Sequence, residues 1–203
     1  MNAQATLERA LDTSRLRGFV TAFADLLAAT RDEQAILQSG GALLERLIGR
    51  DDWLPDAFAR PSPDRYQQYL LHCDSRERFS VVSFVWGPGQ STPIHDHTVW
   101  GLVGVLRGSE KVERFARTPG GSLVSDGVDM LHEGVVDAVS PRLGDIHRVS
   151  NGEPDTPSVS IHVYGANIGA VERSTYGLDG APRRFISGYA NNVLPNLWDR
   201  SRS

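Results

Sequence analysis

Residues 92–101 read TPIHDHTVWG and place two histidines, His95 and His97, one residue apart between a proline and a tryptophan. In an extended strand the side chains of residues i and i+2 point to the same face, so these two imidazoles would project together. Two imidazoles on one face can bind a single metal ion, but two ligands alone make a weak site. A pair of surface histidines explains an isolated His-x-His motif at least as well.

The glycines and histidines around this pair form a longer pattern. Residues 89–108 have the spacing G-x5-H-x-H-x3-G-x6-G, which resembles the first sequence motif of the cupins. Residues 141–151, PRLGDIHRVSN, resemble the second cupin motif, with one extra residue between proline and glycine. Two motifs in the right order are far more specific than one His-x-His. The resemblance implies a double-stranded β-barrel (jelly roll) in which His95, His97 and His147 meet at one metal.

The segments from Phe79 onward favour a β-rich domain. FSVVSFVWGPG, VWGLVGVLRGSEKVERFAR, GVVDAV and SVSIHVYG are β-branched, aromatic or alternating, and Gly, Pro and Asp divide them. Short strands separated by turns, without helical patterns between them, indicate an all-β sandwich or barrel. Near the end of the chain, five apolar residues are expected to pack back onto the domain: Phe185, Tyr189, Leu194, Leu197 and Trp198.

The N-terminal part of the chain has a different pattern. From Leu16 to Leu27, apolar side chains recur at three- and four-residue intervals, which predicts one face of a helix. Gly40 and Gly41 interrupt this pattern, and it resumes over residues 42–48. Residues 64–73, DRYQQYLLHC, follow two prolines and are predicted to form a further short helix.

The composition limits what the protein can be. The net charge is −4, so no basic field attracts phosphates, and nucleic acid is excluded as a partner. No stretch reaches the roughly 18 apolar residues that a membrane helix requires. Cys73 is the only cysteine, which excludes an intrachain disulfide and a cysteine-based zinc site. We therefore expect a soluble, cytoplasmic protein with one mainly β domain over residues 1–203, formed by a helical section over 1–78 and a β-barrel with its tail over 79–203.

Residues 158–165, SVSIHVYG, place Ser160, His162 and Tyr164 on one face of a predicted strand. If this polar face points outward, it is a solvated edge. If it points inward, it is a relay in which the serine holds the histidine and the histidine holds the tyrosine hydroxyl near the metal. Alternation alone does not say which face is buried, so both interpretations stand.

HDHTVWG, PRLGDIHRVSN and SVSIHVYG together resemble the thiol dioxygenases of the cysteine dioxygenase family. These are cupins with a three-histidine non-haem Fe(II) that add both atoms of dioxygen to a thiol sulfur and form a sulfinate. The resemblance extends from about Asp51 to Trp198. It implies one Fe(II) per chain, and it carries the family's catalytic Ser-His-Tyr relay to the three polar residues of SVSIHVYG and the metal ligands to the three motif histidines: Ser160, His162, Tyr164, His95, His97 and His147.

One departure is from cupins in general, and two departures from the mammalian-type cysteine dioxygenases select a branch of the family. Gly101 stands where cupins commonly supply a glutamate ligand, and at or beside the cysteine that mammalian-type cysteine dioxygenases crosslink to the relay tyrosine. Those enzymes bind the substrate carboxylate with an arginine in a YxRNL-like stretch, and here Gln68 stands in that place. In the bacterial 3-mercaptopropionate dioxygenases a glutamine takes that place and an arginine beyond the relay strand serves instead.

Arg173, nine residues past Tyr164, matches that bacterial pattern. A guanidinium suits the role because its fork can bind both oxygens of a carboxylate. Without the resemblance, Arg173 would be interpreted as an exposed loop charge. The remaining histidines, His72 and His132, are expected to be structural or exposed.

The prediction is a non-haem Fe(II) thiol dioxygenase that converts 3-mercaptopropionate to 3-sulfinopropionate, with the thiol carboxylate and O2 as its small-molecule partners. Arg173 and Gln68 would bind the substrate. An L-cysteine dioxygenase is the nearest alternative, although it would need an acceptor for the α-ammonium group. A metal-binding cupin without catalysis is the alternative from another class, but a passive barrel has no need for the relay.

Overall fold

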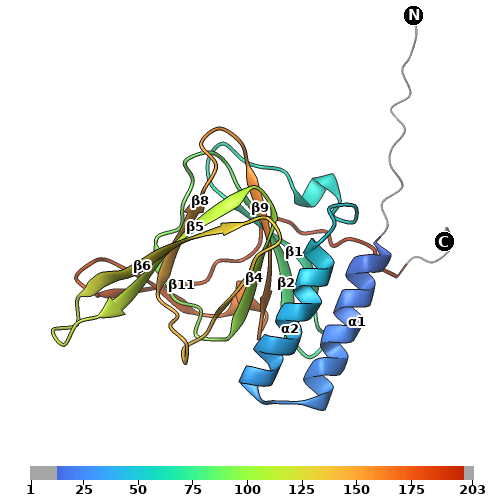
Figure 1. The fold of residues 1–203 in the computed structure, drawn as a ribbon, viewed down its shortest axis with the longest axis horizontal. Helices are drawn as coiled ribbons and strands as arrows, with labels where there is room; N and C mark the ends of the chain where they lie inside the picture. Colours follow the sequence, from blue (N-terminus) through green and yellow to red (C-terminus); the bar gives the residue numbers. More distant parts are fainter. Residues whose placement is uncertain (1–12, 199–203) are drawn as a thin grey trace, which may run out of the picture.

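The computed structural model describes residues 13–198. Two antiparallel sheets face each other, with the strand orders β1-β2-β9-β4-β7 and β11-β10-β3-β8-β5-β6. Side chains from both sheets meet between them in one apolar cluster, which includes Phe84, Val105, Val112 and Val149. This is the predicted cupin double-stranded β-barrel, with two helices at its N-terminal end (Figure 1).

The elements follow one another as α1 (Ser14–Ala29), α2 (Glu33–Ile48), the 3-10 turn η1 (Asp56–Phe58), β1 (Gln67–Cys73), β2 (Ser80–Trp86), β3 (Ile94–His95), β4 (Gly101–Arg107), β5 (Ser109–Arg117), β6 (Leu123–His132), β7 (Val136–Val139), β8 (His147–Asn151), β9 (Ser158–Tyr164), the 3-10 turn η2 (Ile168–Ala170), β10 (Arg173–Tyr176) and β11 (Pro182–Phe185). No helix among the described residues is long and apolar enough to cross a membrane.

The two helices cover the outer face of the five-stranded sheet, as Figure 1 shows beside β4. Phe23 of α1 and Leu44 of α2 belong to the same apolar cluster as Val163 of β9. Since successive side chains of a strand point to opposite faces, the residues that alternate with Val159, Ile161 and Val163 face the barrel interior. The helix layer therefore fixes which face of β9 points inward.

The predicted interruption of the second helix at Gly40 and Gly41 was wrong. Helix α2 runs through both glycines and begins after Asp32, whose carboxylate accepts a hydrogen bond from Ala35 N at 2.8 Å. A Cβ at position 40 would lie 2.9 Å from the Phe23 ring. Gly40 thus allows the two helices to approach closely, and packing of α2 on α1 outweighs its low helix propensity.

The predicted short helix over residues 64–73 was also wrong, because residues 67–73 form β1 and pair with β2. Side chains of this segment alternate between two clusters: Tyr66 and Leu70 pack against the barrel interior, whereas Tyr69 and Leu71 pack against the helix side. A period of two is the signature of a strand. Aromatic and leucine residues suit either element, so the segment was assigned the wrong period.

The C-terminal tail packs back only in part. Leu197 is buried in the cluster beneath the helices, and its carbonyl accepts a hydrogen bond from Arg17 Nη1 at 2.8 Å. Tyr189 packs against the interior cluster, and Phe185 ends β11 half-buried. Leu194 and Trp198 are exposed, contrary to the prediction, because no apolar surface of the described domain covers them.

Candidate metal centre and its hydrogen-bond relay

The three motif histidines come together in the six-stranded sheet. His95 ends β3 and lies opposite His147, the first residue of β8, while His97 follows two residues after His95. One ring nitrogen of each lies within 4.8 Å of the others, and all three side chains are buried. Within residues 13–198 this is the one group of histidine, cysteine or carboxylate side chains with spacing suited to a metal ion.

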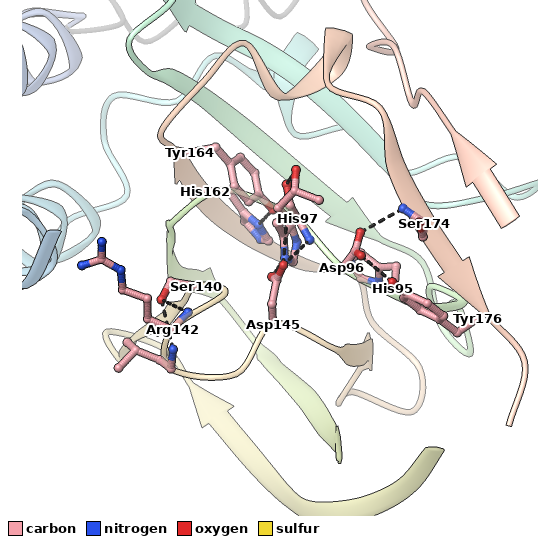
Figure 2. A network of polar contacts seen from close by, with 12 residues as sticks. His95, Asp96, His97, Ser140, Arg142, Asp145, His162, Tyr164, Ser174 and Tyr176 are labelled. Carbon is pink, nitrogen blue, oxygen red and sulfur yellow. Dashed lines mark hydrogen bonds and ion pairs between the residues drawn. The ribbon is translucent and has the colours of Figure 1, made fainter. Parts of the chain in front are cut away.

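Asp145 holds His97 in place (Figure 2). Its Oδ1 lies 2.8 Å from His97 Nδ1, and its Oδ2 accepts hydrogen bonds from the backbone N–H groups of His97 and Thr98, both at 2.8 Å. Thr98 has a φ of 61°, a left-handed conformation that costs free energy for a threonine and turns the chain so that both N–H groups point at one carboxylate. Sequence analysis missed Asp145.

The partners of the ring Nδ1 atoms define the tautomers of two histidines. His95 Nδ1 lies 3.1 Å from the Pro93 carbonyl oxygen, which can only accept a hydrogen bond. The Asp145 carboxylate is likewise an acceptor for His97 Nδ1. Both Nδ1 atoms therefore carry the proton, which leaves the Nε2 lone pairs of His95 and His97 free to coordinate. Such hydrogen-bonded imidazoles are the usual arrangement around protein metals.

All three histidines are held neutral. Burial lowers the pKa of His95 to about 4 and holds the pKa values of His97 and His147 well below the ordinary histidine value. Repulsion from His95 lowers the pKa values of His97 and His147 further, and the charge of Arg173 lowers those of His95 and His97. Neutral imidazole is the form that binds a metal, so the cluster needs no deprotonation before a cation enters.

Gly101 leaves this cluster without a glutamate, and no other carboxylate of the described chain replaces it. A Cβ at position 101 would lie 2.9 Å from the Tyr164 ring, so the tyrosine occupies the space that a side chain there would need. Asp96 lies beside the histidines, but it accepts hydrogen bonds from Ser174 N at 2.9 Å and from the Tyr176 hydroxyl at 2.5 Å (Figure 2). A metal held by the three histidines would keep its positive charge and open positions.

The polar face of β9 points inward and forms a continuous hydrogen-bonded chain. Ser160 Oγ lies 2.7 Å from His162 Nε2, and His162 Nδ1 lies 2.8 Å from the Tyr164 hydroxyl. All three side chains are buried, so of the two interpretations of this strand the solvated edge is wrong. The Tyr164 ring stacks on His97 with ring centroids 5.2 Å apart, which places the end of the chain beside the metal-site histidines.

Arg173 is buried rather than exposed, with only 5% of its surface accessible. It begins β10, whose Thr175 lies opposite His95. Its Nη2 donates a hydrogen bond to Ser187 Oγ at 2.7 Å, and its guanidinium lies over the Phe185 ring at 4.8 Å. Its Nε has no hydrogen-bond partner, and no carboxylate forms an ion pair with it within residues 13–198. Burial lowers the pKa of this guanidinium.

Gln68 lies on β1 opposite Phe84 of β2, an interior residue, so both side chains lie on the barrel side of their sheet. Its Nε2 donates to the Gly188 carbonyl at 2.9 Å. Gly188 directly follows Ser187, the hydrogen-bond partner of Arg173. Gln68 and Ser187 line one pocket of about 210 Å³. The two predicted substrate-binding residues, Arg173 and Gln68, thus donate hydrogen bonds to adjacent residues of the same C-terminal segment, Ser187 and Gly188.

The remaining two histidines do not belong to the three-histidine group. His72 is half-buried against the Phe79 ring at 5.6 Å, and burial lowers its pKa. His132 is exposed, as expected, and ends β6. Trp100 packs over Gly165 and stacks with Phe23 at 6.0 Å.

The fold and the site define a cupin with a three-histidine metal centre and an inward Ser-His-Tyr chain. The sequence model of the family described as "Cysteine dioxygenase type I" matches residues 44–174, most of the chain. The protein therefore belongs to the cysteine dioxygenase type I family.

Individual relatives agree with this assignment. Cysteine dioxygenase type 1 of Danio rerio is 30% identical over 117 residues, which cover 56% of each chain. The Homo sapiens protein of the same name is 28% identical over 110 residues, covering 53% of this chain and 54% of that one. The chain thus spans about half the length of the curated relatives it matches. Among solved structures, a double-stranded β-helix domain protein from Klebsiella pneumoniae matches with 20% identity and a TM-score of 0.46, over 59% of this chain and 95% of that one.

Proposed function

We propose that this protein is a thiol dioxygenase that converts 3-mercaptopropionate and O2 to 3-sulfinopropionate, with one Fe(II) per chain held by His95, His97 and His147. Membership of the cysteine dioxygenase family supports the reaction class. The buried, unpaired guanidinium of Arg173 beside the histidines is the observation that supports a carboxylated substrate. Thiols and Fe(II) both persist in a reducing compartment, so we place the activity in the cytoplasm.

The three histidines fit an Fe(II) ion. They are neutral imidazoles, a ligand type that suits iron, and His95 and His97 each present a free Nε2. No carboxylate completes the set among the described residues, so a bound metal would keep open coordination positions. A bound Fe(II) would supply the redox chemistry between the thiol sulfur and dioxygen, and the substrate would supply all the electrons.

Arg173 binds the substrate carboxylate in this proposal. A buried cation without a counter-charge is costly, and its cost falls when an anion pairs with it. Within residues 13–198 its Nε is unpartnered and Ser187 is its one side-chain hydrogen-bond acceptor. A carboxylate would satisfy the free donor, and the guanidinium would set the distance between carboxylate and sulfur. Gln68 orients the Ser187–Gly188 segment, which forms one side of this carboxylate-binding site.

Tyr164 donates a hydrogen bond near the reacting atoms. Burial raises its pKa, so the phenol keeps its proton at neutral pH. Preorganised donors aimed at developing negative charge on oxygen lower the barrier because no reorganisation is needed when the charge appears. His162 and Ser160 hold the phenol, and the stacked Phe84 ring, 4.1 Å from the His162 ring, keeps water from it.

The charge balance favours 3-mercaptopropionate over L-cysteine. The α-ammonium group of cysteine needs an acceptor, and the carboxylates nearest the histidines, Asp96 and Asp145, already accept two and three hydrogen bonds. L-Cysteine remains the second candidate because the curated relatives carry the name cysteine dioxygenase type 1. A non-catalytic metal-binding barrel has no use for the buried relay.

The deciding experiment is oxygen uptake by anaerobically Fe(II)-loaded protein, with 3-mercaptopropionate, L-cysteine and the uncharged analogue 3-mercaptopropanol at equal concentrations. We expect fastest uptake with 3-mercaptopropionate and one sulfinate per O2. A preference for L-cysteine would overturn the substrate, and no uptake with any thiol by iron-loaded protein would overturn the reaction.

Arg173→Ala tests the carboxylate-binding site directly. We expect KM for 3-mercaptopropionate to rise about 100-fold, since a charge-assisted bidentate pair is lost, while turnover of 3-mercaptopropanol stays unchanged. Arg184→Ala is the matched control, because Arg184 lies on the neighbouring strand β11 and pairs with exposed Glu172. An unchanged KM in Arg173→Ala removes this residue from the substrate site.

A further inference from the structure

Glu110 is a carboxyl group buried inside the barrel with no assigned role. It lies on β5 between Leu131 of β6 and Asn151 of β8, and none of its surface is accessible. Val112, two residues along the same face, belongs to the interior cluster, so Glu110 also points inward. Within residues 13–198 it forms no ion pair, and neither carboxyl oxygen has a hydrogen bond of standard geometry.

Two groups face this carboxyl from the opposite sheet. The Ser160 hydroxyl of β9 and the Trp86 indole of β2 both act to lower its pKa, but burial dominates and raises the pKa to about 7. Trp86 Nε1 has no hydrogen-bond partner in the described chain. From β9 the titratable groups are His162 and Tyr164, and the charge of Glu110 raises the pKa of Tyr164. Its strand neighbours Leu131 and Asn151 carry no charge.

Ser160, at the end of the chain Ser160–His162–Tyr164 opposite to Tyr164, is the member that faces Glu110. A hydroxyl has one proton to donate and a neutral imidazole has one N–H. The protonation state of Glu110 therefore sets the direction of every hydrogen bond in this chain. An ionised Glu110 accepts from Ser160, so Ser160 Oγ accepts from His162 Nε2–H. His162 Nδ1 is then an acceptor, and Tyr164 donates its proton inward to it.

A protonated Glu110 reverses every bond. It donates to Ser160, Ser160 donates to His162 Nε2, and His162 Nδ1–H donates to the Tyr164 oxygen. The phenol proton is then free to point towards the metal-site histidines. The two arrangements differ by one proton: a proton accepted at the Tyr164 oxygen shifts one proton along each link and ends on Glu110.

We propose that Glu110 is the fourth member of the relay, a positioning residue that lets Tyr164 donate a hydrogen bond into the metal site only while Glu110 carries a proton. The inference rests on the proposed function, in which Tyr164 donates a hydrogen bond near the reacting atoms. It further gives the site a buried store for one proton, such as the proton that a thiol substrate releases when its sulfur binds as the thiolate.

The first test compares kcat against pH, at saturating thiol, for the Fe(II)-loaded wild type, Glu110→Gln and Glu113→Gln. Glutamine keeps the shape, can donate to Ser160 and cannot ionise. We expect wild-type kcat to fall at least tenfold as pH rises through about 7, in parallel with ionisation of Glu110. Glu110→Gln should keep the low-pH value throughout, whereas Glu113→Gln, at a half-buried glutamate of the same strand that pairs with Arg148, should behave as wild type.

The second test does not depend on turnover. Infrared difference spectra between low and high pH should show the carbonyl stretch of one buried carboxylic acid that disappears near pH 7 in wild type. The band should be missing in Glu110→Gln, and Ser160→Ala and Tyr164→Phe should shift it because both sever the chain. This result would support the inference even if no thiol were oxidised.

The inference is overturned by either of two results. One is a kcat–pH profile of Glu110→Gln identical to that of wild type. The other is a wild-type spectrum without an acid band that titrates near neutrality, or with a band that Ser160→Ala leaves unmoved. If Glu110→Gln proves unstable, Ser160→Ala supplies both readouts alone, since it should also abolish the pH dependence of kcat.

Discussion

The two faces of β9 show how one strand can serve stability and chemistry separately. Its outward side chains, Val159, Ile161 and Val163, are apolar and pack beneath the helices. Its inward side chains, Ser160, His162 and Tyr164, are as deeply buried but polar, and each is hydrogen-bonded to the next. Equal burial with opposite chemistry means that outward substitutions should change the free energy of unfolding, and inward ones should change the reaction.

The largest expected effect lies with the metal ligands. His147→Ala removes one of three imidazoles, and a site with two ligands should lose its metal. We expect metal content near zero and no oxygen uptake above background, measured by elemental analysis and an oxygen electrode. His132→Ala, at an exposed histidine, is the control. Full iron content in His147→Ala would contradict the three-histidine site.

The second largest effect is expected on the outward face of β9. Ile161→Ala leaves a cavity beneath the helices and should lower the free energy of unfolding by about 2–5 kcal/mol. Metal content and kcat of the folded fraction should stay at wild-type values. Denaturant unfolding and oxygen uptake on the same sample measure both. A large drop in kcat per folded molecule would mean that the two faces are not independent.

Glu110→Gln should make the protein more stable at high pH. The pKa of Glu110 is raised from an ordinary 4.5 to about 7, so the unfolded chain loses this proton first and the free energy of unfolding falls as pH rises from 4.5 to 7. Glutamine escapes this cost. The variant should match wild type below pH 4.5 and exceed it above pH 7 by up to about 3 kcal/mol, as followed by denaturant unfolding at several pH values. A difference that does not vary with pH would contradict the raised pKa.

Tyr164→Phe, on the inward face, should have the smallest effect of these substitutions. Tyr164→Phe removes one donor and should lower kcat about 10- to 100-fold while KM and iron content stay unchanged. The melting temperature should move by only a few degrees, since the ring still packs against His97. Equal kcat in Tyr164→Phe and wild type would separate the relay from the reaction.

The sequence alone predicted the parts of the fold and site that depend on spacing. The two histidine motifs placed His95, His97 and His147 together, and the period of two in SVSIHVYG placed the relay on one face. Which face was buried could not be predicted, because the answer depends on the helices that pack on β9. Strand β1 was assigned as a helix, since Tyr and Leu fit both periods.

Asp145 and Glu110 were missed for a related reason. An acidic residue in a turn or on a strand next to lysine has no local signal of burial. The role of Asp145 depends on His97 and Thr98, 48 and 47 residues earlier in the chain. The role of Glu110 depends on Ser160 and Trp86, which lie on the other sheet. Only the folded barrel brings these groups together.

The carboxylate-binding site proposed around Arg173 bears on how the substrate range of this protein could change. Arg173 and Gln68 both hold the Ser187–Gly188 segment, which follows β11 and supplies none of the three histidines. Under the proposed function, changes in this short segment would alter which acids bind without disturbing the three histidines or the strands that carry them. Substrate range and metal binding could then change independently, and new thiol specificities would arise most readily through substitutions near Ser187 and Gly188.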